Sequence, residues 1–423
     1  MAAETRSTTI VKRKRSLTHV GGEVEAKGGS ALVEALVRAL RIEDTGVPEV
    51  DADGRDALDR SDVHGFHTYP ARMHPHTAHE LVRAFTPRRG IVLDPFCGSG
   101  TVVLEASALG LAAHGTDLNP LAVDLARTKL QRYAAEELDL LVREAERIAT
   151  CADDRRKARA GATRRYEERD AALFDPHVLL ELDSLRSSIH ASEAPPSVRR
   201  ALALVFSAIL VKLSRKKSDT SHALEQKRIA AGFAAKLFRR KTTEFVERVR
   251  AYAGRREGKA RWRVELDDAT RLASVRDSSV GLIVSSPPYA ATYDYLAHHD
   301  LRLRWLGLDG TAFARGEFGA RRHYDRLTID AARSRWQRDL ATLLRSLARV
   351  TADGATVCLQ FADSAVDGEP LFANDELRAA VARSPFAWLA EASQVRPHFH
   401  GPTNRAFAER PRREHVFLLK RIG

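Results

Sequence analysis

A short apolar run that stops at two prolines constrains the fold more than any other stretch of the chain. Residues 280–284 read VGLIV, which is apolar and β-branched enough to predict a buried strand. Pro287 and Pro288 end that strand, because neither ring nitrogen can donate to a sheet hydrogen bond. Ser286 stands before the prolines and Tyr289 after them. The pattern predicts a stiff turn, bearing a hydroxyl and an aromatic ring, at a strand's carboxyl end, where open α/β sheets bind ligands.

A second strand ends in a glycine-rich loop. Residues 91–93 predict a short strand, DPFCGSGT follows at residues 94–101, and a helix is expected from there to residue 109. Gly98 and Gly100 allow the backbone to approach a ligand closely at the start of that helix.

The details of this loop exclude two cofactor classes. Val103 stands where a dinucleotide fingerprint needs its third glycine, and no Gly-Lys-Ser/Thr follows for a nucleoside triphosphate. A further strand at residues 112–116 ends at Asp117. An acid at that position can accept hydrogen bonds from both hydroxyls of a ribose.

The remaining periodicity predicts an α/β domain and a helical insertion. Helices at residues 78–85 and 336–350 and strands at 356–361 and 416–419 continue the alternation. Residues 125–260 instead show helical spacing, punctuated at Pro195 and Pro196. A chain of 423 residues exceeds one ordinary core, so two structural units are expected.

Positive charge is concentrated in the helical stretch. Residues 212–261 hold sixteen Lys or Arg and five Asp or Glu, which accounts for nearly all of the net charge of +12. Such a surplus indicates either a solvated helical face or a surface that binds a polyanion. We favour DNA binding because the surplus is so concentrated.

Two parts of the chain together resemble a known family. Residues 67–120 and 264–295 resemble class I S-adenosylmethionine-dependent DNA methyltransferases that modify exocyclic amines, whose catalytic turn reads Ser, Asp or Asn, then Pro-Pro and an aromatic. The resemblance implies a Rossmann-like α/β sheet with helices on both faces, here with a large, mostly helical insertion. It implies catalytic roles for Ser286, Pro287, Pro288 and Tyr289. It implies S-adenosyl-L-methionine as the cofactor, held by Tyr69, Asp94, Pro95, Phe96, Cys97, Gly98, Gly100, Thr101, Asp117, Leu118, Asn119 and Asp268.

Two points within this resemblance are less sharply determined. In the family, the acid at the position of Asp268 contacts the adenine amino group of the cofactor. The neighbouring Asp267 is nearly indistinguishable from it in the sequence. The insertion stands before Asp268, whereas the family's α-type arrangement places its recognition unit after that acid. The position of a recognition unit is therefore our inference.

The turn's first residue bears on the product. Ser286 resembles the N4-cytosine branch, so we expect methylation of the exocyclic N4 of cytosine in duplex DNA. Methylation of cytosine carbon 5 would require a nucleophilic Cys, and none of the three cysteines lies beside the turn in sequence. The alternatives are an N6-adenine DNA methyltransferase, an RNA base methyltransferase, and a non-catalytic nucleic-acid-binding protein on the same fold.

The expected organisation follows. Residues 1–60 form an N-terminal extension, partly disordered, with a basic run at residues 12–15. Residues 61–130 and 262–423 form the catalytic domain, and residues 131–261 form a basic helical unit that recognises DNA. Its candidate DNA contacts are Lys216, Lys217, Lys227, Arg228, Arg239 and Arg240. Within the catalytic domain, residues 307–330 contain glycine and arginine and are expected to form a mobile loop near the substrate.

Partners and location are expectations of the same kind. Double-stranded DNA is the expected partner, with a cognate restriction endonuclease as a further candidate in a restriction–modification system. The three cysteines lack disulfide or metal-ligand spacing and no apolar leader opens the chain, so we expect a cytoplasmic protein without a metal. The longest apolar run, residues 201–211, is too short to span a bilayer.

Overall fold

The computed structural model describes residues 23–42, 62–221, 223–396 and 405–422. The basic run at residues 12–15 lies outside these ranges. Within them, no helix is both long and apolar enough to cross a membrane.

The core of the molecule is an eight-stranded sheet with the strand order β1-β9-β10-β6-β5-β2-β3-β4. The strands β6, β5, β2, β3 and β4 pair in parallel, whereas the pairings β6–β10, β10–β9 and β9–β1 are antiparallel. In chain order they span Val24–Gly28 (β1), Ile91–Asp94 (β2), Ala113–Asp117 (β3), Trp262–Leu266 (β4), Val280–Ser285 (β5), Thr351–Ala362 (β6), Phe386–Val395 (β9) and Arg413–Arg421 (β10). A separate hairpin pairs β7 (Ser364–Val366) with β8 (Glu369–Leu371). This sheet confirms the predicted α/β, Rossmann-like class.

Helices cover both faces of the sheet, and side chains alternate between two cores. In β5, Leu282 and Val284 belong to one buried cluster and Ile283 to the other, as the two-residue period of a strand requires. The first cluster packs under α1 (Ser30–Leu40), α3 (Pro75–Ala84), α4 (Thr101–Ala108) and α5 (Pro120–Leu130). The second packs under α13 (Ile329–Val350) and α14 (Ala373–Val381). Parallel strands buried on both faces explain the continuous apolar runs in the sequence.

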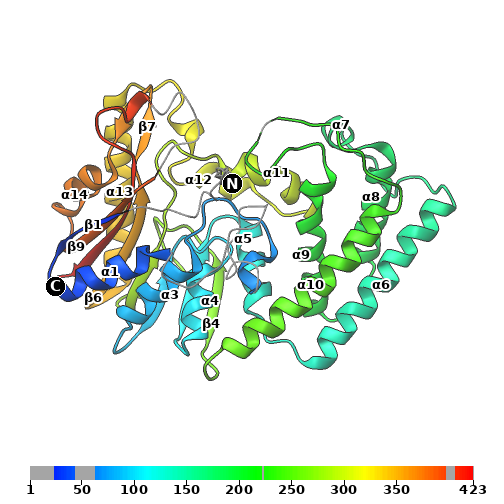
Figure 1. Cartoon of the computed structure of the whole chain (residues 1–423), viewed down its shortest axis with the longest axis horizontal. Coiled ribbons are helices and arrows are strands. Elements are labelled where there is room, and N and C mark those ends of the chain that lie inside the picture. Colours follow the sequence, from blue (N-terminus) through cyan, green and yellow to red (C-terminus); the bar gives the residue numbers. More distant parts are fainter. Residues whose placement is uncertain (1–22, 43–61, 222, 397–404, 423) are drawn as a thin grey trace, which may run out of the picture.

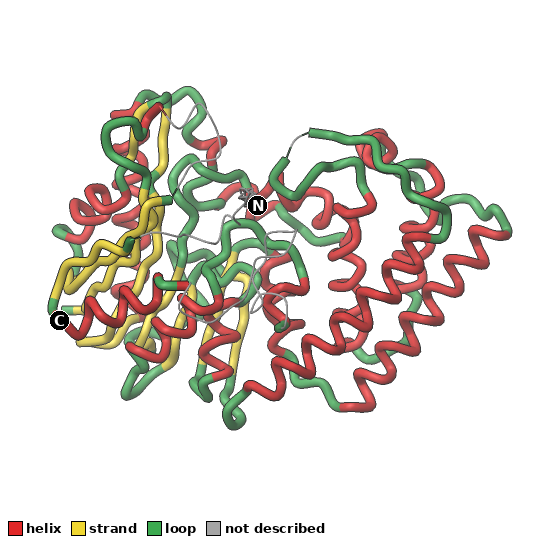
Figure 2. The backbone as a smooth tube through the Cα atoms, in the orientation of Figure 1, coloured by secondary structure: helices red, strands yellow, loops and turns green. Residues whose placement is uncertain are grey.

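The insertion is a helical unit beside the β4 edge of the sheet (Figures 1 and 2). Its helices are α6 (Ala135–Lys157), α7 (Glu168–Leu173), α8 (Pro176–His190), α9 (Pro196–Leu213) and α10 (Phe233–Arg255). Their apolar faces join the same buried cluster as α4 and α5. The buried Tyr252 hydroxyl also donates to the carbonyl of Leu104, 2.8 Å away. The insertion therefore shares a core with the catalytic unit.

A buried group of charges fastens α10 to the catalytic unit. Arg255 donates to both Asp62 and Glu105, and His64 Nε2 donates to Glu105 Oε1 at 2.7 Å. Burial alone would raise the pKa of Glu105, but hydrogen bonds from His64 and His79 and the charge of Arg255 hold that pKa well below its ordinary value. Asp62, His64 and Glu105 each have one atom that could ligate a metal ion, and these atoms lie within 4.8 Å of one another. Because a guanidinium already compensates both carboxylates, we interpret the group as an internal ion network.

The start of the chain is more integrated than an extension. β1 pairs along its length with β9, and α1 packs against α3 and β9. Thr77 of α3 donates to the carbonyl of Ala39 at 2.8 Å. The described residues before position 60 thus form an edge strand and a covering helix of the catalytic unit. The correction arises because edge pairing depends on β9, a partner far away in the sequence.

Two further segments differ from expectation. Residues 307–330, expected to form a mobile loop, contain α12 (Thr311–Gly316) and a 3-10 turn (Arg321–His323) after α11 (Tyr295–Leu306). In the basic segment that follows α9, the described residues 214–221 and 223–232 form no helix, and Gly232 is the N-cap of α10. Gly232 has a φ of 82°, which favours glycine and explains why the helix starts there.

Candidate active site

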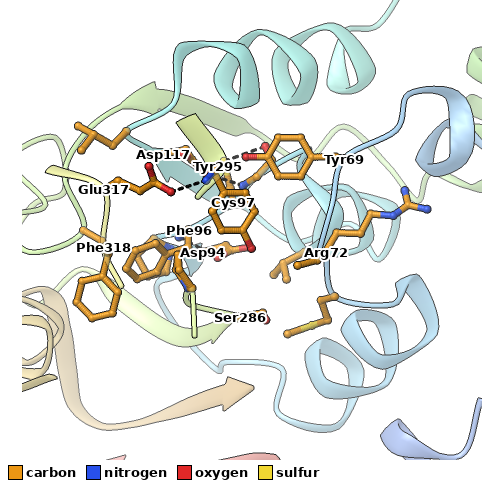
Figure 3. Close-up of a pocket in the computed structure, with 18 of the residues that line it drawn as sticks. Tyr69, Arg72, Asp94, Phe96, Cys97, Asp117, Ser286, Tyr295, Glu317 and Phe318 are labelled. Carbon is orange, nitrogen blue, oxygen red and sulfur yellow. Dashed lines mark hydrogen bonds between the residues drawn. The ribbon is translucent and has the colours of Figure 1, made fainter. Parts of the chain in front are cut away.

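A cavity of about 790 Å³ opens at the carboxyl ends of β2, β3 and β5 (Figure 3). We call it the first cavity. The predicted residues that line it are Tyr69, Asp94, Pro95, Phe96, Cys97, Gly98, Thr101, Asp117, Leu118, Asp268, Ser286 and Pro288. It therefore brings together the glycine loop and the Ser-Pro-Pro-Tyr turn, which stand far apart in the sequence. The predicted residues Gly100, Asn119, Pro287 and Tyr289 are described but do not line this cavity.

The glycine loop is held in place by Asp117. Gly98 N donates to Asp117 Oδ2 and Asn119 N donates to Asp117 Oδ1, both at 2.8 Å. Gly100 has a φ of 93° and caps α4; a Cβ there would lie 2.9 Å from the Cβ of Ala126. Both the backbone conformation and the close packing therefore require glycine at position 100.

The two acids at the strand ends have raised pKa values. Burial raises the pKa of Asp117 to about 6, and the nearby carboxyl of Glu317 adds to the shift. Burial likewise raises the pKa of Asp94 to about 7. Burial destabilises the charged form of a carboxylate, and hydrogen bonds donated by a ligand offset that cost in free energy. Perturbed acids inside a cavity are typical of functional sites.

The Ser-Pro-Pro-Tyr turn is tied to the glycine loop by a hydrogen bond from Ser285, the residue before it. Ser285 Oγ donates to Asp94 Oδ1 at 2.7 Å, and Phe96 N donates to the same oxygen at 3.1 Å. Ser286, the next residue, lines the first cavity. Ser285 thus fixes the position at which the turn leaves its strand.

The side chain of Tyr289, the last residue of the turn, does not line the first cavity. Its side chain is buried, and its hydroxyl donates to Glu414 Oε1 at 2.8 Å. Burial and the charge of Glu414 raise the pKa of this hydroxyl well above its ordinary value. Its ring lines a second, smaller cavity that adjoins the first.

An aromatic wall closes one side of the first cavity. The Tyr69 ring stacks on His299 with a centroid distance of 4.8 Å, and its hydroxyl accepts from Asn119 Nδ2 at 3.4 Å. Asn119 is fully buried and caps α5 by accepting from Leu121 N. Asn119, which the sequence placed among the cofactor-binding residues, therefore has a structural role behind the aromatic wall.

The structure separates the two neighbouring acids after β4. Asp267 accepts hydrogen bonds at Oδ2 from the backbone and the hydroxyl of Ser274, at 2.7 and 2.6 Å. Asp268 lines the first cavity, with Oδ1 bonded to Thr270. Asp268 is thus the acid placed to meet a ligand.

A roof that was not predicted residue by residue completes the first cavity. Phe313, Glu317 and Phe318, from the segment between α11 and α13, face it, and Figure 3 shows Phe318 beside Phe96 with Tyr69 on the opposite side. The Phe96 and Phe318 rings lie 5.3 Å apart. Glu317 accepts from the backbone N–H of Tyr295 at 2.6 Å and from Arg322. The remaining unpredicted residues on the wall are Ala71, Arg72, Met73, Val102, Ala269, Tyr295 and Gly316.

These roof residues carried weak signals in the sequence. Ala71, Arg72 and Met73 stand in the 67–75 segment that resembles the family's N-terminal cofactor motif. Residues 307–330 were expected near the substrate, yet no periodicity marked Phe313 or Glu317 as inward-facing.

The six candidate DNA-contacting residues divide into two groups. Lys217, Arg228 and Arg240 are exposed. Arg239 instead pairs with Glu146 and Asp153 of α6, at 2.9 and 3.0 Å, and Lys227 donates to the carbonyls of Lys216 and Val211. Lys216 is half-buried, and burial lowers its pKa. Part of the positive surplus therefore holds the insertion together.

Comparison with known proteins identifies the segment that carries the glycine loop. Residues 50–128 match the family model described as DNA methylase (N6/N4 methyltransferase). Over 87 residues the chain is 36% identical to the Type II methyltransferase M.MvaI of Kocuria varians, covering 20% of this chain and 19% of that protein.

Two further comparisons give one short sequence match and one structural match of low sequence identity. Over 74 residues the chain is 32% identical to a tRNA (guanine(10)-N2)-dimethyltransferase of Methanothermobacter thermautotrophicus, covering 17% and 22% of the two chains. A solved SAM-dependent methyltransferase of Methanosarcina mazei covers 84% of this chain and 99% of its own, at 12% identity and a TM-score of 0.31. The chain thus spans only about a fifth of the length of these two curated relatives.

The first cavity fits S-adenosylmethionine, the cofactor that the family match implies. Asp117 retains lone pairs beyond those used by Gly98 and Asn119, so it can accept from ribose hydroxyls. Phe96 and Phe318 offer apolar surface for a flat ring, and Asp268 adds an acceptor. Bound there, the cofactor would supply a sulfonium methyl group for transfer. Residues 50–128 are thus similar to the N6/N4 amino-methyltransferases of DNA.

Proposed function

We propose that this protein transfers a methyl group from S-adenosylmethionine to the exocyclic N4 of cytosine in duplex DNA. One observation carries the proposal: Ser286 and Pro288 of the turn share a cavity with Gly98 and Asp117. An amine-activating turn and a cofactor loop thus meet at one point, as methyl transfer between two bound molecules requires.

The turn supplies the groups that an exocyclic amine needs. Its nitrogen is a poor nucleophile, because the lone pair is delocalised into the ring. The Ser286 hydroxyl and the Pro287 carbonyl are suited to accept from the two amine hydrogens and to offset the positive charge that develops. The bonds Ser285–Asp94 and Tyr289–Glu414 hold both ends of the turn before substrate arrives. Positioning is therefore the main contribution that we assign to the protein.

The choice of cytosine rests on the side chain that heads the turn. A Ser hydroxyl is neutral, whereas the Asp found in related turns is charged. N6 of adenine is the same kind of amine, so the same machinery would act on it. The assay below separates the two bases.

Support for a DNA substrate comes from the segment between α9 and α10, residues 214–232. It carries the exposed Lys217 and Arg228. Asp219 of this segment pairs with the buried Arg302 of α11, which also donates to Thr68 Oγ1 at 3.0 Å, next to Tyr69 on the cavity wall. The segment is thereby anchored at Asp219 near the first cavity, and we assign phosphate contacts to its exposed basic side chains.

An RNA base is the second candidate substrate. It is favoured by the likeness, over 74 residues, to a tRNA (guanine(10)-N2)-dimethyltransferase. That reaction also methylates an exocyclic amine, so the same turn would serve it.

The test is methyl transfer from labelled cofactor to mixed-sequence duplex DNA and, separately, to transfer RNA, followed by separation of the nucleosides. We expect label in N4-methylcytosine. Ser286→Ala should lower the rate by about 10²–10³, because one acceptor is lost where charge develops. Ser279→Ala, at a half-buried serine before the same strand whose hydroxyl donates to the carbonyl of Arg276, is the matched control. Label in N6-methyladenine would refute cytosine as the target base. Label in RNA alone would refute DNA as the substrate, and the absence of label would refute methyl transfer itself.

A further inference from the structure

A second cavity of about 380 Å³ lies behind the catalytic turn. Tyr289, Gln360, Gln394, Arg396 and Glu414 line it, and Ala71 and Arg72 line both this cavity and the first. A molecule that reaches the turn from this side would therefore contact side chains of β6, β9 and β10.

The register of the sheet explains why polar groups gather here. Val416 lies opposite Gln360, and Glu414 lies opposite Gln394, so these side chains share one face of the sheet. Ser285, just before the turn, lies opposite Leu359, so the polar row is at the same edge as the turn. One step deeper on that face, Cys358 and Leu418 are apolar and fully buried. The face thus changes from apolar to polar only where it meets the second cavity.

Most of these polar groups are engaged with one another. Glu414 Oε1 accepts from the Tyr289 hydroxyl at 2.8 Å and is paired with Arg396. This network fixes the Tyr289 ring as one wall of the second cavity.

Gln360 is different. Its side chain is 6% exposed, and its Oε1 is buried without a hydrogen-bond partner among the described residues. A buried amide oxygen that lacks a partner costs stability, so a methionine of similar size would suit a purely structural position better. The amide turns between two orientations about its last bond, so it can present either an acceptor or an N–H donor to the cavity.

We propose that Gln360 is a base-reading residue, which hydrogen-bonds the ring edge of the base whose amino group is methylated. The inference rests on the function proposed above. There the amine hydrogens are taken by Ser286 and the Pro287 carbonyl, so the adjacent ring edge remains to be recognised. On cytosine that edge carries two acceptors, N3 and O2, which match the N–H groups of an amide. The Tyr289 ring, held by Glu414, forms the neighbouring wall.

Gln360→Met and Gln360→Glu test the proposal in the full-length chain. Methionine removes the amide at similar volume, and glutamate keeps the shape but removes the donor. We expect each to lower kcat/KM for duplex DNA about 10-fold, mainly through KM, and to leave the calorimetric affinity for S-adenosylmethionine unchanged. The methionine variant should unfold at the same or a higher temperature, which a merely structural role would not produce.

Gln337→Met is the matched control, since this glutamine of α13 bonds to Glu376 away from both cavities. If the wild type methylates DNA while both Gln360 variants keep its kcat/KM and product, the inference is wrong and the proposed function stands. If the wild type transfers no label to any base, the proposed function fails, and the inference fails with it.

Discussion

Replacing Asp117 with asparagine tests how the first cavity holds its cofactor. Both carboxylate oxygens accept backbone hydrogen bonds at 2.8 Å, from Gly98 and Asn119. Asparagine keeps the size of the side chain but turns an NH₂ group toward one of these donors, and it removes the charge. The variant should therefore fold with a disturbed glycine loop and a weaker ribose site.

The magnitude follows from the bonds that are lost. A hydrogen bond to a charged group contributes about 1.5–3 kcal/mol net. Losing one such bond to a ribose hydroxyl corresponds to a Kd for S-adenosylmethionine that is about 10- to 150-fold higher.

The pH dependence gives a second measure. Because the pKa of Asp117 is about 6, the wild-type carboxylate is increasingly protonated below that pH and loses its capacity as a charged acceptor. Wild-type affinity should fall as the pH drops through 6, and Asp117→Asn should lack that component. Asp94, with a pKa of about 7, titrates in the same cavity, so the comparison is repeated in an Asp94→Asn background.

The assay is titration calorimetry from pH 5 to pH 8, with circular dichroism to show that each variant is folded. A folded Asp117→Asn protein that binds with the wild-type Kd would refute the assigned role. So would a variant that keeps the full wild-type pH profile in the Asp94→Asn background.

Four further predictions concern stability and DNA binding. The folded-state pKa of Asp94 is raised from 3.8 to about 7, so its stabilising contribution is present below pH 3.8 and is lost as the pH rises through 7. This loss amounts to about 1.4 kcal/mol of unfolding free energy per pKa unit. Asp94→Asn should remove it, because the asparagine oxygen can still accept from Ser285 and Phe96 but does not titrate. Wild-type and variant proteins with the same pH dependence of unfolding would contradict this prediction. Tyr289→Phe should lower the free energy of unfolding by about 1 kcal/mol or more in urea titrations, because Glu414 loses a buried donor; no change would mean that the bond is unimportant. Charge reversal at Lys217, Arg228 and Arg240 should flatten the salt dependence of DNA affinity by a log–log slope of about 0.9 for each lost phosphate contact. Arg239→Ala should instead lower stability and leave that slope intact, and the opposite pattern would reverse the two roles.

The parts of the fold that the sequence predicted well are those specified locally. β2, β3 and β5 were found because buried parallel strands are continuous apolar runs that end at turn-forming residues. The turn at Gly98 and Gly100 and the strand-end acid Asp117 leave a spacing that can be read directly from the sequence, and Gly98 and Asp117 line the first cavity.

What could not be predicted depends on partners far away in the chain. β1 is a strand only because β9 lies beside it. Glu317 turns inward because it meets the backbone of Tyr295 and the guanidinium of Arg322. The charge count over residues 212–261 likewise could not show that Arg239 is neutralised by α6. Periodicity indicates which residues are buried but not which segment buries them.

The helical insertion has consequences for how such a chain could be re-engineered. Its entrance and exit meet, since Arg132 donates to the carbonyl of Gly258 at 2.8 Å, so a foreign module could be spliced in without moving β3 or β4. The ion network that fastens α10 draws Asp62 and Glu105 from outside the insertion, however, with Arg255 inside it. A graft that omits Arg255 would strand two buried carboxylates in the recipient. A successful exchange of the insertion must therefore carry this arginine along, or neutralise both acids at the same time.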